Sequence, residues 1–156
     1  MEQITKKLLD KLYRPPQGSH KGQNGKLTII GGSKLFHGAS LWALKTATRI
    51  VDMVFYSSVK ENKKLAENLS SQLYDFIFIP RNQIKKYISQ SETVLIGPGM
   101  VRGSKSLTGT GESGQETKKL TRDLISQFPD KKWIIDAGAL QELEADWLKQ
   151  LDQVLI

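Results

Sequence analysis

Small residues follow three apolar runs of this sequence, at the points where strands are expected to end. The runs over 27–30, 93–96 and 133–135 lead directly into Gly31-Gly32-Ser33, Gly97-Pro98-Gly99 and Asp136-Ala137-Gly138-Ala139. Open α/β sheets bind their ligands at the carboxyl ends of parallel strands. Glycine at these ends lets a ligand approach the main chain, because no Cβ stands in the way. The pattern therefore predicts one ligand crevice, lined mostly by backbone and carrying the carboxylate of Asp136.

Two parts of this predicted crevice can bind polar groups. Asp136 can accept hydrogen bonds from ligand hydroxyls, or it can only cap the helix that follows. The turn with Gly32 and Ser33 leads into a helix expected to begin at Ala39, and helix N-termini attract phosphate groups. A tight strand-to-helix turn also needs glycine for structural reasons, so the ligand and structural interpretations are both kept for this turn.

The histidines and the lack of cysteine exclude several kinds of chemistry. Disulfides, thiolate metal sites and thiol catalysis are impossible without cysteine. His20 and His37 have no partner at metal-ligand spacing, so no metal-binding residues are expected. A Ser-His-Asp triad is rejected because no serine has the neighbours of a nucleophile elbow. His20 stands beside Lys21, and this pair can face an anion or form an ordinary loop.

Composition and charge narrow the classes of partner. The 156 residues carry a net charge of +7, and 38% of them are hydrophobic and 25% charged, which is typical of one globular domain. The aromatic residues fall inside strand and helix patterns rather than among exposed basic residues, which argues against nucleic acid. No apolar run approaches the roughly 20 residues that cross a bilayer. We therefore expect a cytoplasmic protein with a small-molecule ligand, and an anionic one is compatible with the charge.

Strand and helix patterns alternate along the chain, which predicts an α/β fold with a mostly parallel sheet between two layers of helices. The expected strands are 27–30, 53–59, 76–79, 93–96, 133–135 and 154–156, and the expected helices are 39–51, 60–73, 83–89, 118–128 and 139–150. An amphipathic helix is expected within 1–14. Residues 103–116 are rich in Gly, Ser and Thr and predict a flexible loop. Their G-x-G-x-x-G match at 109–114 follows no strand, so it does not indicate a dinucleotide fingerprint.

An ordered set of short motifs resembles a known family over residues 19–156. The motifs are Ser19-His20-Lys21-Gly22, Gly25-Lys26-Leu27, Ile29-Ile30-Gly31-Gly32-Ser33, Gly38-Ala39, Ile96-Gly97-Pro98-Gly99 and Ile135-Asp136-Ala137 with Ala139-Leu140. Together they resemble the ADP- or ATP-dependent NAD(P)H-hydrate dehydratases, which form the C-terminal domain of YjeF-type proteins and have a ribokinase-like fold.

The resemblance implies a hydro-lyase reaction on a damaged cofactor. Water is removed from hydrated NADH or NADPH at the expense of ADP or ATP, with Mg²⁺. Ala39, Gly97 and Gly99 would border the dinucleotide substrate, and Asp136 would lie in the same crevice. His20 and Lys21 would lie near its mouth.

The resemblance also implies an incomplete domain, because the family continues beyond the point that matches Ile156. Its Thr-Pro-His segment and the glycine-rich turn with the catalytic base have no counterpart here, so no catalytic residue is assigned. A homo-oligomer or a complementing C-terminal half is the expected protein partner. The first alternative is a non-catalytic dinucleotide- or nucleotide-binding module that acts with a partner chain. The second is another nucleotide-binding α/β domain, such as a flavodoxin-like one, and a sheet order beginning 2-1-3 is expected to fit both.

Overall fold

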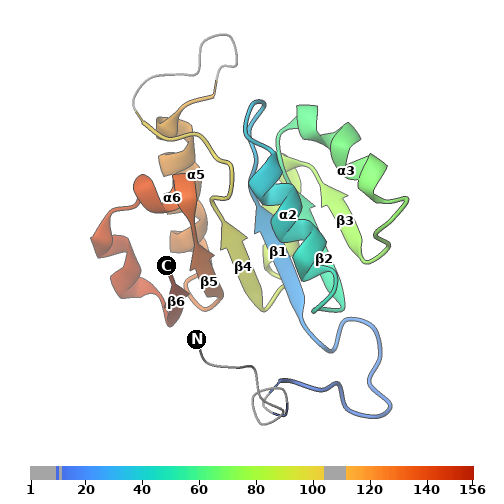
Figure 1. The fold of residues 1–156 in the computed structure, drawn as a ribbon. Coiled ribbons are helices and arrows are strands. Elements are labelled where there is room, and N and C mark those ends of the chain that lie inside the picture. Colours follow the sequence, from blue (N-terminus) through green and yellow to red (C-terminus); the bar gives the residue numbers. More distant parts are fainter. Residues whose placement is uncertain (1–9, 11, 104–111) are drawn as a thin grey trace, which may run out of the picture.

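A parallel sheet runs through the centre of the molecule. The computed structural model describes residues 10, 12–103 and 112–156. Its sheet has six strands, all parallel, in the order β3-β2-β1-β4-β5-β6 (Figure 1). The strands are β1 (Lys26–Ile30), β2 (Met53–Ser57), β3 (Phe76–Ile79), β4 (Thr93–Ile96), β5 (Lys132–Ile135) and β6 (Gln153–Leu155). The expected α/β fold with a parallel sheet is confirmed.

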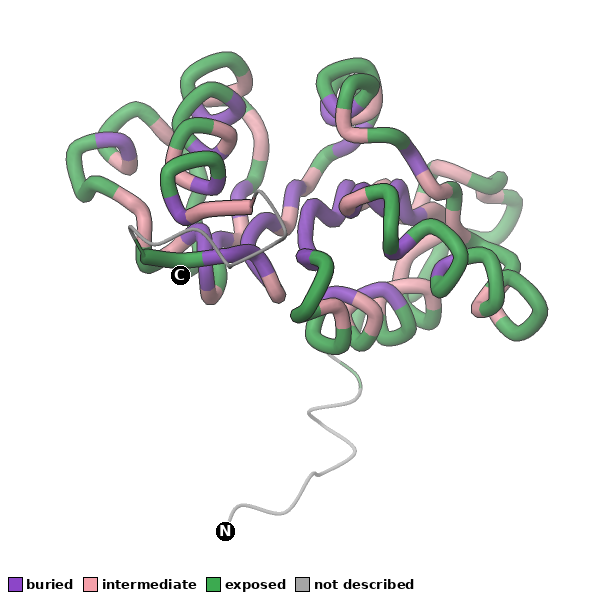
Figure 2. The backbone as a smooth tube through the Cα atoms, turned by 90° about the horizontal axis from the view of Figure 1, so that it is seen from above, coloured by how far each residue is buried: buried purple, intermediate pink, exposed green. Residues whose placement is uncertain are grey.

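Helices cover both faces of this sheet (Figure 2). The helical segments are α2 (Gly38–Ala47), α3 (Lys63–Leu69), α4 (Ile84–Ile88), α5 (Gly114–Gln127) and α6 (Ala137–Gln141), with 3₁₀ turns η1 (Lys60–Asn62), η2 (Arg81–Gln83) and η3 (Ala145–Gln150). The strand order reverses its direction after β3, because β4 pairs with β1 on the side away from β2. With right-handed crossovers, this reversal places α2 and α3 on one face and the later helices on the other.

Alternation along the strands builds a separate core on each face. The α2–α3 core contains the buried residues Ile29, Leu44, Val54, Tyr56 and Ala66. The α4–α6 core contains Ile30, Ile84, Ile88, Val94, Ile96, Met100, Leu124, Ile125, Trp133, Ile135, Ala139 and Trp147. Successive side chains of a strand point to opposite faces. The runs that end at the predicted crevice are therefore mostly apolar, without strict alternation, because the central strands are covered on both faces.

Several expected helix boundaries were wrong. Helix α5 begins at Gly114, not at 118, because Ser113 forms a capping box with Glu116, so the last part of the expected loop 103–116 is helical. Residues 104–111 of that loop lie outside the described residues. The expected helix 139–150 is divided between α6 and η3. Most of the expected helix within 1–14 lies outside the described residues, and 12–14 form a bend and coil instead of a helix.

The expected strand order was also wrong. Strand β1 lies between β2 and β4, and β3 lies outside β2. A flavodoxin-like sheet begins 2-1-3, so this order does not match the flavodoxin-like alternative. None of the helices within the described ranges combines the length and apolar character needed to cross a bilayer.

Candidate functional site

The carboxyl ends of β1, β4 and β5 meet at one edge of the sheet, as the glycine-ended runs predicted. Strands β1 and β4 are neighbours, although the chain leaves them toward helices on opposite faces. Such a reversal is where open α/β sheets form a crevice. The strands stay paired up to the turns, because Gly97 N donates to Ile30 O at 3.0 Å and Asp136 N donates to Ile96 O at 2.9 Å.

The glycines at this edge allow the turns to pack against one another. Gly97 has φ of 120°, and a Cβ there would overlap the main-chain carbonyl of Asp136. Gly99 has φ of 72°, and a Cβ there would overlap the main-chain carbonyl of Phe36. Glycine is therefore required at both positions by contacts inside the chain.

The main-chain amides of the turn after β1 are hydrogen-bonded to other groups of the chain. Gly32 N donates to Pro98 O at 2.7 Å, and Ser33 N donates to Phe36 O at 3.1 Å. The Ser33 hydroxyl accepts from Phe36 N at 3.0 Å. The next amide, Lys34 N, donates to the Glu112 carboxylate at 2.9 Å. The main-chain amides of Gly32, Ser33 and Lys34 are thus already paired, so a phosphate would have to displace a partner to bind them.

A cleft of about 370 Å³ lies between the three turns. It is lined by Phe36, Gly99, Met100, Val101, Arg102, Ala137 and Gly138. Phe36 follows β1, Gly99 follows β4, and Ala137 follows β5, so each of the three strand ends contributes to it. A cleft therefore lies where the sequence predicted a ligand crevice, and Gly99 lines it directly. That this cleft binds a ligand stays a prediction.

Asp136 and Ala39 flank this cleft along the chain. Asp136 is exposed and occupies the N-cap position of α6, but its side chain makes no capping hydrogen bond. The capping interpretation of this carboxylate is therefore wrong. Ala39 is exposed in the first turn of α2. Their contact with a ligand stays a prediction.

His20 and Lys21 lie at the other edge of the sheet. They line a hollow with Asp52 and Asp75, which immediately precede β2 and β3. Lys21 Nζ is 3.1 Å from Asp75 Oδ1. The expectation that His20 and Lys21 lie near the mouth of the crevice is wrong, because the segment leads into the amino end of β1.

The carboxylate of Asp52 organises the segment around His20. Its Oδ2 accepts hydrogen bonds from Gly22 N, Asn24 N and Asn24 Nδ2, each at 3.0 Å. The main-chain hydrogen bond from Asn24 is the largest influence that lowers the pKa of Asp52. The contacts of Asp52 therefore explain the conformation of this segment without a ligand.

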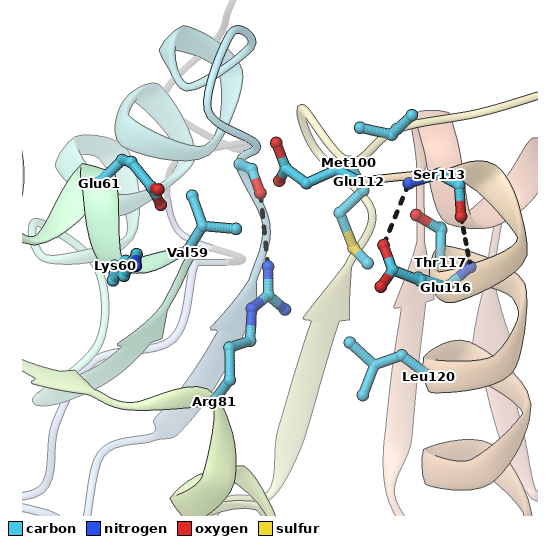
Figure 3. A pocket seen from close by; sticks show the side chains of 12 residues that line it. Val59, Lys60, Glu61, Arg81, Met100, Glu112, Ser113, Glu116, Thr117 and Leu120 are labelled. Atoms are coloured by element: carbon cyan, nitrogen blue, oxygen red, sulfur yellow. Dashed lines mark hydrogen bonds between the residues drawn. The ribbon is translucent and has the colours of Figure 1, made fainter. Parts of the chain in front are cut away.

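A larger pocket of about 570 Å³ opens beside the turn after β1, and we call it the Arg81 pocket (Figure 3). It is lined by Gly32, Val59, Lys60, Glu61, Arg81, Met100, Val101, Glu112, Ser113, Glu116, Thr117 and Leu120. Lys60 and Glu61 come from η1 on one side, and Glu116 and Leu120 come from α5 on the other (Figure 3).

Arg81 is the central cation of this pocket. Its Nη2 donates to Gly31 O at 3.1 Å and to Gly32 O at 3.4 Å. Burial lowers the pKa of Arg81 to about 10, while Tyr56 and Glu112 act in the opposite direction. The guanidinium therefore stays charged at neutral pH. Its Nη1 is shielded from solvent and has no hydrogen-bond partner within the described part of the chain.

Sequence reasoning did not identify Arg81 or Glu112 as site residues. Arg81 follows β3 and Pro80, so its place at the carboxyl end of a strand is a signal that could have identified it. It was missed because no glycine marks that end. Glu112 lies in the stretch expected to be a flexible loop, where its long-range bond to Lys34 left no local pattern.

The residues of the Arg81 pocket do not fit a resident Mg²⁺ ion. The Glu116 carboxylate accepts from Ser113 N at 3.1 Å, and that of Glu112 accepts from Lys34 N at 2.9 Å. Across the described ranges, no group of three His, Asp or Glu side chains is placed to hold a metal ion. Protein ligands for Mg²⁺ are usually free carboxylates at an octahedral site. We therefore assign no chemical step to this metal.

Comparisons with known proteins identify the relatives of this chain. No family model matches the sequence. The bifunctional NAD(P)H-hydrate repair enzyme Nnr of Methanocaldococcus jannaschii is 32% identical over 148 residues, a match that covers 87% of this chain and 26% of that protein. The ADP-dependent (S)-NAD(P)H-hydrate dehydratase of Streptococcus pneumoniae is 26% identical over 142 residues, a match that covers 90% of this chain and 46% of that protein.

Solved structures with a similar fold agree with these relatives. A ribokinase-like superfamily protein from Enterococcus faecalis has a TM-score of 0.68 and 18% identity, covering 89% of this chain and 46% of that one. A protein from Streptococcus mutans has a TM-score of 0.70 and 24% identity, covering 97% of this chain and 53% of that one. This likeness confirms the expected ribokinase-like, three-layer fold.

The resemblance seen in the motifs extends to most of the chain. The chain spans between about a quarter and a half of the length of the relatives described above. The ordered glycine turns at the carboxyl edge and the ribokinase-like topology agree with the sequence matches. The homologues of this chain are therefore NAD(P)H-hydrate repair enzymes and dehydratases, which it matches over part of their length.

Proposed function

We propose that this chain forms the dinucleotide-binding part of an ADP- or ATP-dependent NAD(P)H-hydrate dehydratase. The reaction removes water from hydrated NADH or NADPH. The observation that carries the proposal is the cleft between the three strand-end turns. It lies at the strand-order reversal, where α/β sheets bind ligands, in a chain whose relatives are named repair enzymes for this substrate.

The residues around the cleft suit binding of a dinucleotide. Phe36 is 56% exposed and offers an aromatic face to a flat ring. The carboxylate of Asp136 would accept hydrogen bonds from ribose hydroxyls, because it has no hydrogen-bond donor among the described residues. Gly99 lines the cleft without a side chain, and Gly97, in the same turn, would border the substrate. These roles concern binding and orientation, and the proposal assigns no catalytic base to a described residue.

The binding part of the proposal is tested with an Asp136→Asn variant. Isothermal titration calorimetry with hydrated NADH should show about tenfold weaker binding than for the unchanged chain, because a charge-assisted hydrogen bond becomes a neutral one. Asp123→Asn is the matched control, since Asp123 is exposed on α5 away from the cleft. Equal affinity for both variants would contradict the role of Asp136. A folded chain that binds no hydrated or intact dinucleotide would refute the proposal.

Turnover is measured separately from binding. The chain is mixed with hydrated NADH, Mg²⁺ and either ADP or ATP, and the return of NADH absorbance is followed. Turnover with one nucleotide and not the other would define the preferred nucleotide. Binding of the hydrate without turnover would favour the alternative, a non-catalytic dinucleotide-binding module that acts with a partner chain.

We propose a homo-oligomer or a complementing C-terminal half as the protein partner, in the cytoplasm. The support is the apolar surface of the edge strand β6 and the residue after it, where Val154 is 40%, Leu155 64% and Ile156 67% exposed. Light scattering after size-exclusion chromatography tests the oligomer, and cell fractionation tests the location. A chain that is monomeric at all concentrations would leave only the complementing half.

A further inference from the structure

A carboxylate from one side of the Arg81 pocket is bound to the main chain on the other side. Glu112 lies just before α5, yet its Oε2 accepts a hydrogen bond from Lys34 N at 2.9 Å, 78 residues away in the sequence. Lys34 belongs to the turn between β1 and α2, and Gly32 of the same turn lines the pocket. The half-buried Glu112 side chain extends from the α5 side of the pocket toward the turn after β1 (Figure 3).

The pocket beneath Glu112 contains a shielded cation that requires a negative charge. Nη2 of Arg81 donates hydrogen bonds to the carbonyls of Gly31 and Gly32, while Nη1 has no hydrogen-bond partner within the described ranges. A shielded cation is costly unless an anion compensates it. Glu112 is the carboxylate that acts on Arg81 electrostatically, since it raises the pKa of Arg81 against the effect of burial. Glu112 thus serves as the internal counter-ion of this pocket.

We propose that the Arg81 pocket binds an anionic group of a ligand, a phosphate or a carboxylate, and that the Glu112 carboxylate occupies that place until the ligand displaces it. The donors that the anion would take are Lys34 N–H and the guanidinium of Arg81, which suit oxyanions. The pocket volume of about 570 Å³ also accommodates the groups to which the anion is attached.

Displacement is required because, apart from Arg81 and Glu112, the pocket lining has more carboxylates than cations. Glu61 and Glu116 line the pocket together with Lys60. The Glu116 carboxylate is already bound, because it accepts a hydrogen bond from Ser113 N at 3.1 Å. An anion that entered while Glu112 stayed in place would meet a like charge at the donors it needs. Glu112 therefore sets the affinity of the pocket by competition.

This inference deepens the proposed function, because the phosphates of a nucleotide or dinucleotide are anions that could reach this edge of the sheet. The anion site itself is tested without a dinucleotide. Inorganic pyrophosphate, ADP and intact NADPH are titrated separately by calorimetry, which separates a free phosphate from a nucleotide source.

The decisive variants change Glu112 in two steps. Glu112→Gln keeps a weaker acceptor for Lys34 N–H, and Glu112→Ala removes it. We expect pyrophosphate to bind about threefold more tightly to the first and about tenfold more tightly to the second than to the unchanged chain. Glu61→Ala is the matched control, because it removes the same charge from the same pocket without a bond to Lys34. It should change the affinity by less than about twofold.

Arg81 provides the opposite test. Arg81→Met should reduce pyrophosphate binding to the Glu112→Ala chain by about tenfold or more. Arg81→Lys keeps the charge and should retain part of the affinity, which covers the case in which Arg81→Met does not fold. Thermal unfolding followed by circular dichroism shows which variants are folded.

The results distinguish this inference from the proposed function. Pyrophosphate affinity that is unchanged by Glu112→Ala, or raised equally by Glu61→Ala, overturns the competition. If Glu112→Ala strengthens pyrophosphate binding while hydrated NADH does not bind, the anion site stands and the proposed function fails. If hydrated NADH binds equally to all Glu112 variants and pyrophosphate does not respond to them, the proposed function stands and the anion site fails.

Discussion

Replacing Gly97 with alanine directly tests how the three strand-end turns pack. Gly97 has φ of 120°, and its new Cβ would overlap the main-chain carbonyl of Asp136 and lie 2.9 Å from the Cβ of Ala139. The backbone conformation alone costs about 1–3 kcal/mol for a residue other than glycine. The overlap is with main chain and cannot be relieved by a rotamer change, so a shift of the turn adds about 1–3 kcal/mol. We expect a loss of about 2–6 kcal/mol, out of the roughly 5–15 kcal/mol typical of a domain.

The loss is measured by urea unfolding followed by tryptophan fluorescence. Trp133 and Trp147 are buried in the α4–α6 core, whereas Trp42 is 78% exposed. The buried pair should therefore dominate the change in emission on unfolding. Gly97→Ala should lower the urea midpoint without a large change in the slope, since the surface exposed on unfolding is similar.

Two other glycines provide controls that separate backbone strain from steric overlap. Gly18 has φ of 85° with nothing within 4 Å of a Cβ, so Gly18→Ala should cost only about 1 kcal/mol. Gly38 has ordinary backbone angles and open space at the start of α2, so Gly38→Ala should be neutral or stabilise by up to about 1 kcal/mol. A loss for Gly97→Ala no larger than that for Gly18→Ala would refute the packing of the turns derived above.

Three further changes test other parts of the fold. Asp52→Asn should lower the melting temperature at pH 7, and this difference from the unchanged chain should shrink as the pH falls below about 4. The reason is that the main-chain hydrogen bond from Asn24 lowers the pKa of Asp52, so the stabilisation by the carboxylate is present above the unfolded pKa and is lost on protonation. A difference in melting temperature that does not change with pH would contradict this. Ser113→Ala removes the capping box of α5 and should cost about 1 kcal/mol in urea unfolding. Trp133→Phe loses the 2.9 Å hydrogen bond from Nε1 to Phe128 O and part of the buried volume, and should cost about 1–3 kcal/mol in chemical unfolding.

The strands were predictable because each signal is local. Phe76–Ile79 and Thr93–Ile96 were expected with the bounds that the structure has, since apolar runs bounded by Pro or Gly mark buried parallel strands. The start of α5 was missed although it has a local signal. Ser113 and Glu116 have the spacing of a capping box, but the surrounding Gly, Ser and Thr residues favoured a loop.

The candidate site was predictable only in part. Neighbouring strand ends could be expected at one edge, and Gly99 does line the cleft there. The resemblance placed Lys21 at the mouth of the crevice, whereas the structure pairs it with Asp75 at the opposite edge. Arg81 and Glu112 act through long-range contacts to the turn after β1. Such contacts depend on the strand order, which the sequence pattern did not determine.

Strand β1 has a mechanical role that follows from two adjacent residues. Ile29 belongs to the α2–α3 core and Ile30 to the α4–α6 core, and both are fully buried. One peptide bond therefore connects the two faces of the sheet at its centre. Loosening of either core tilts or frees β1 and is transmitted directly to the other face. We therefore expect the two cores to unfold as one cooperative unit, although different helices cover them.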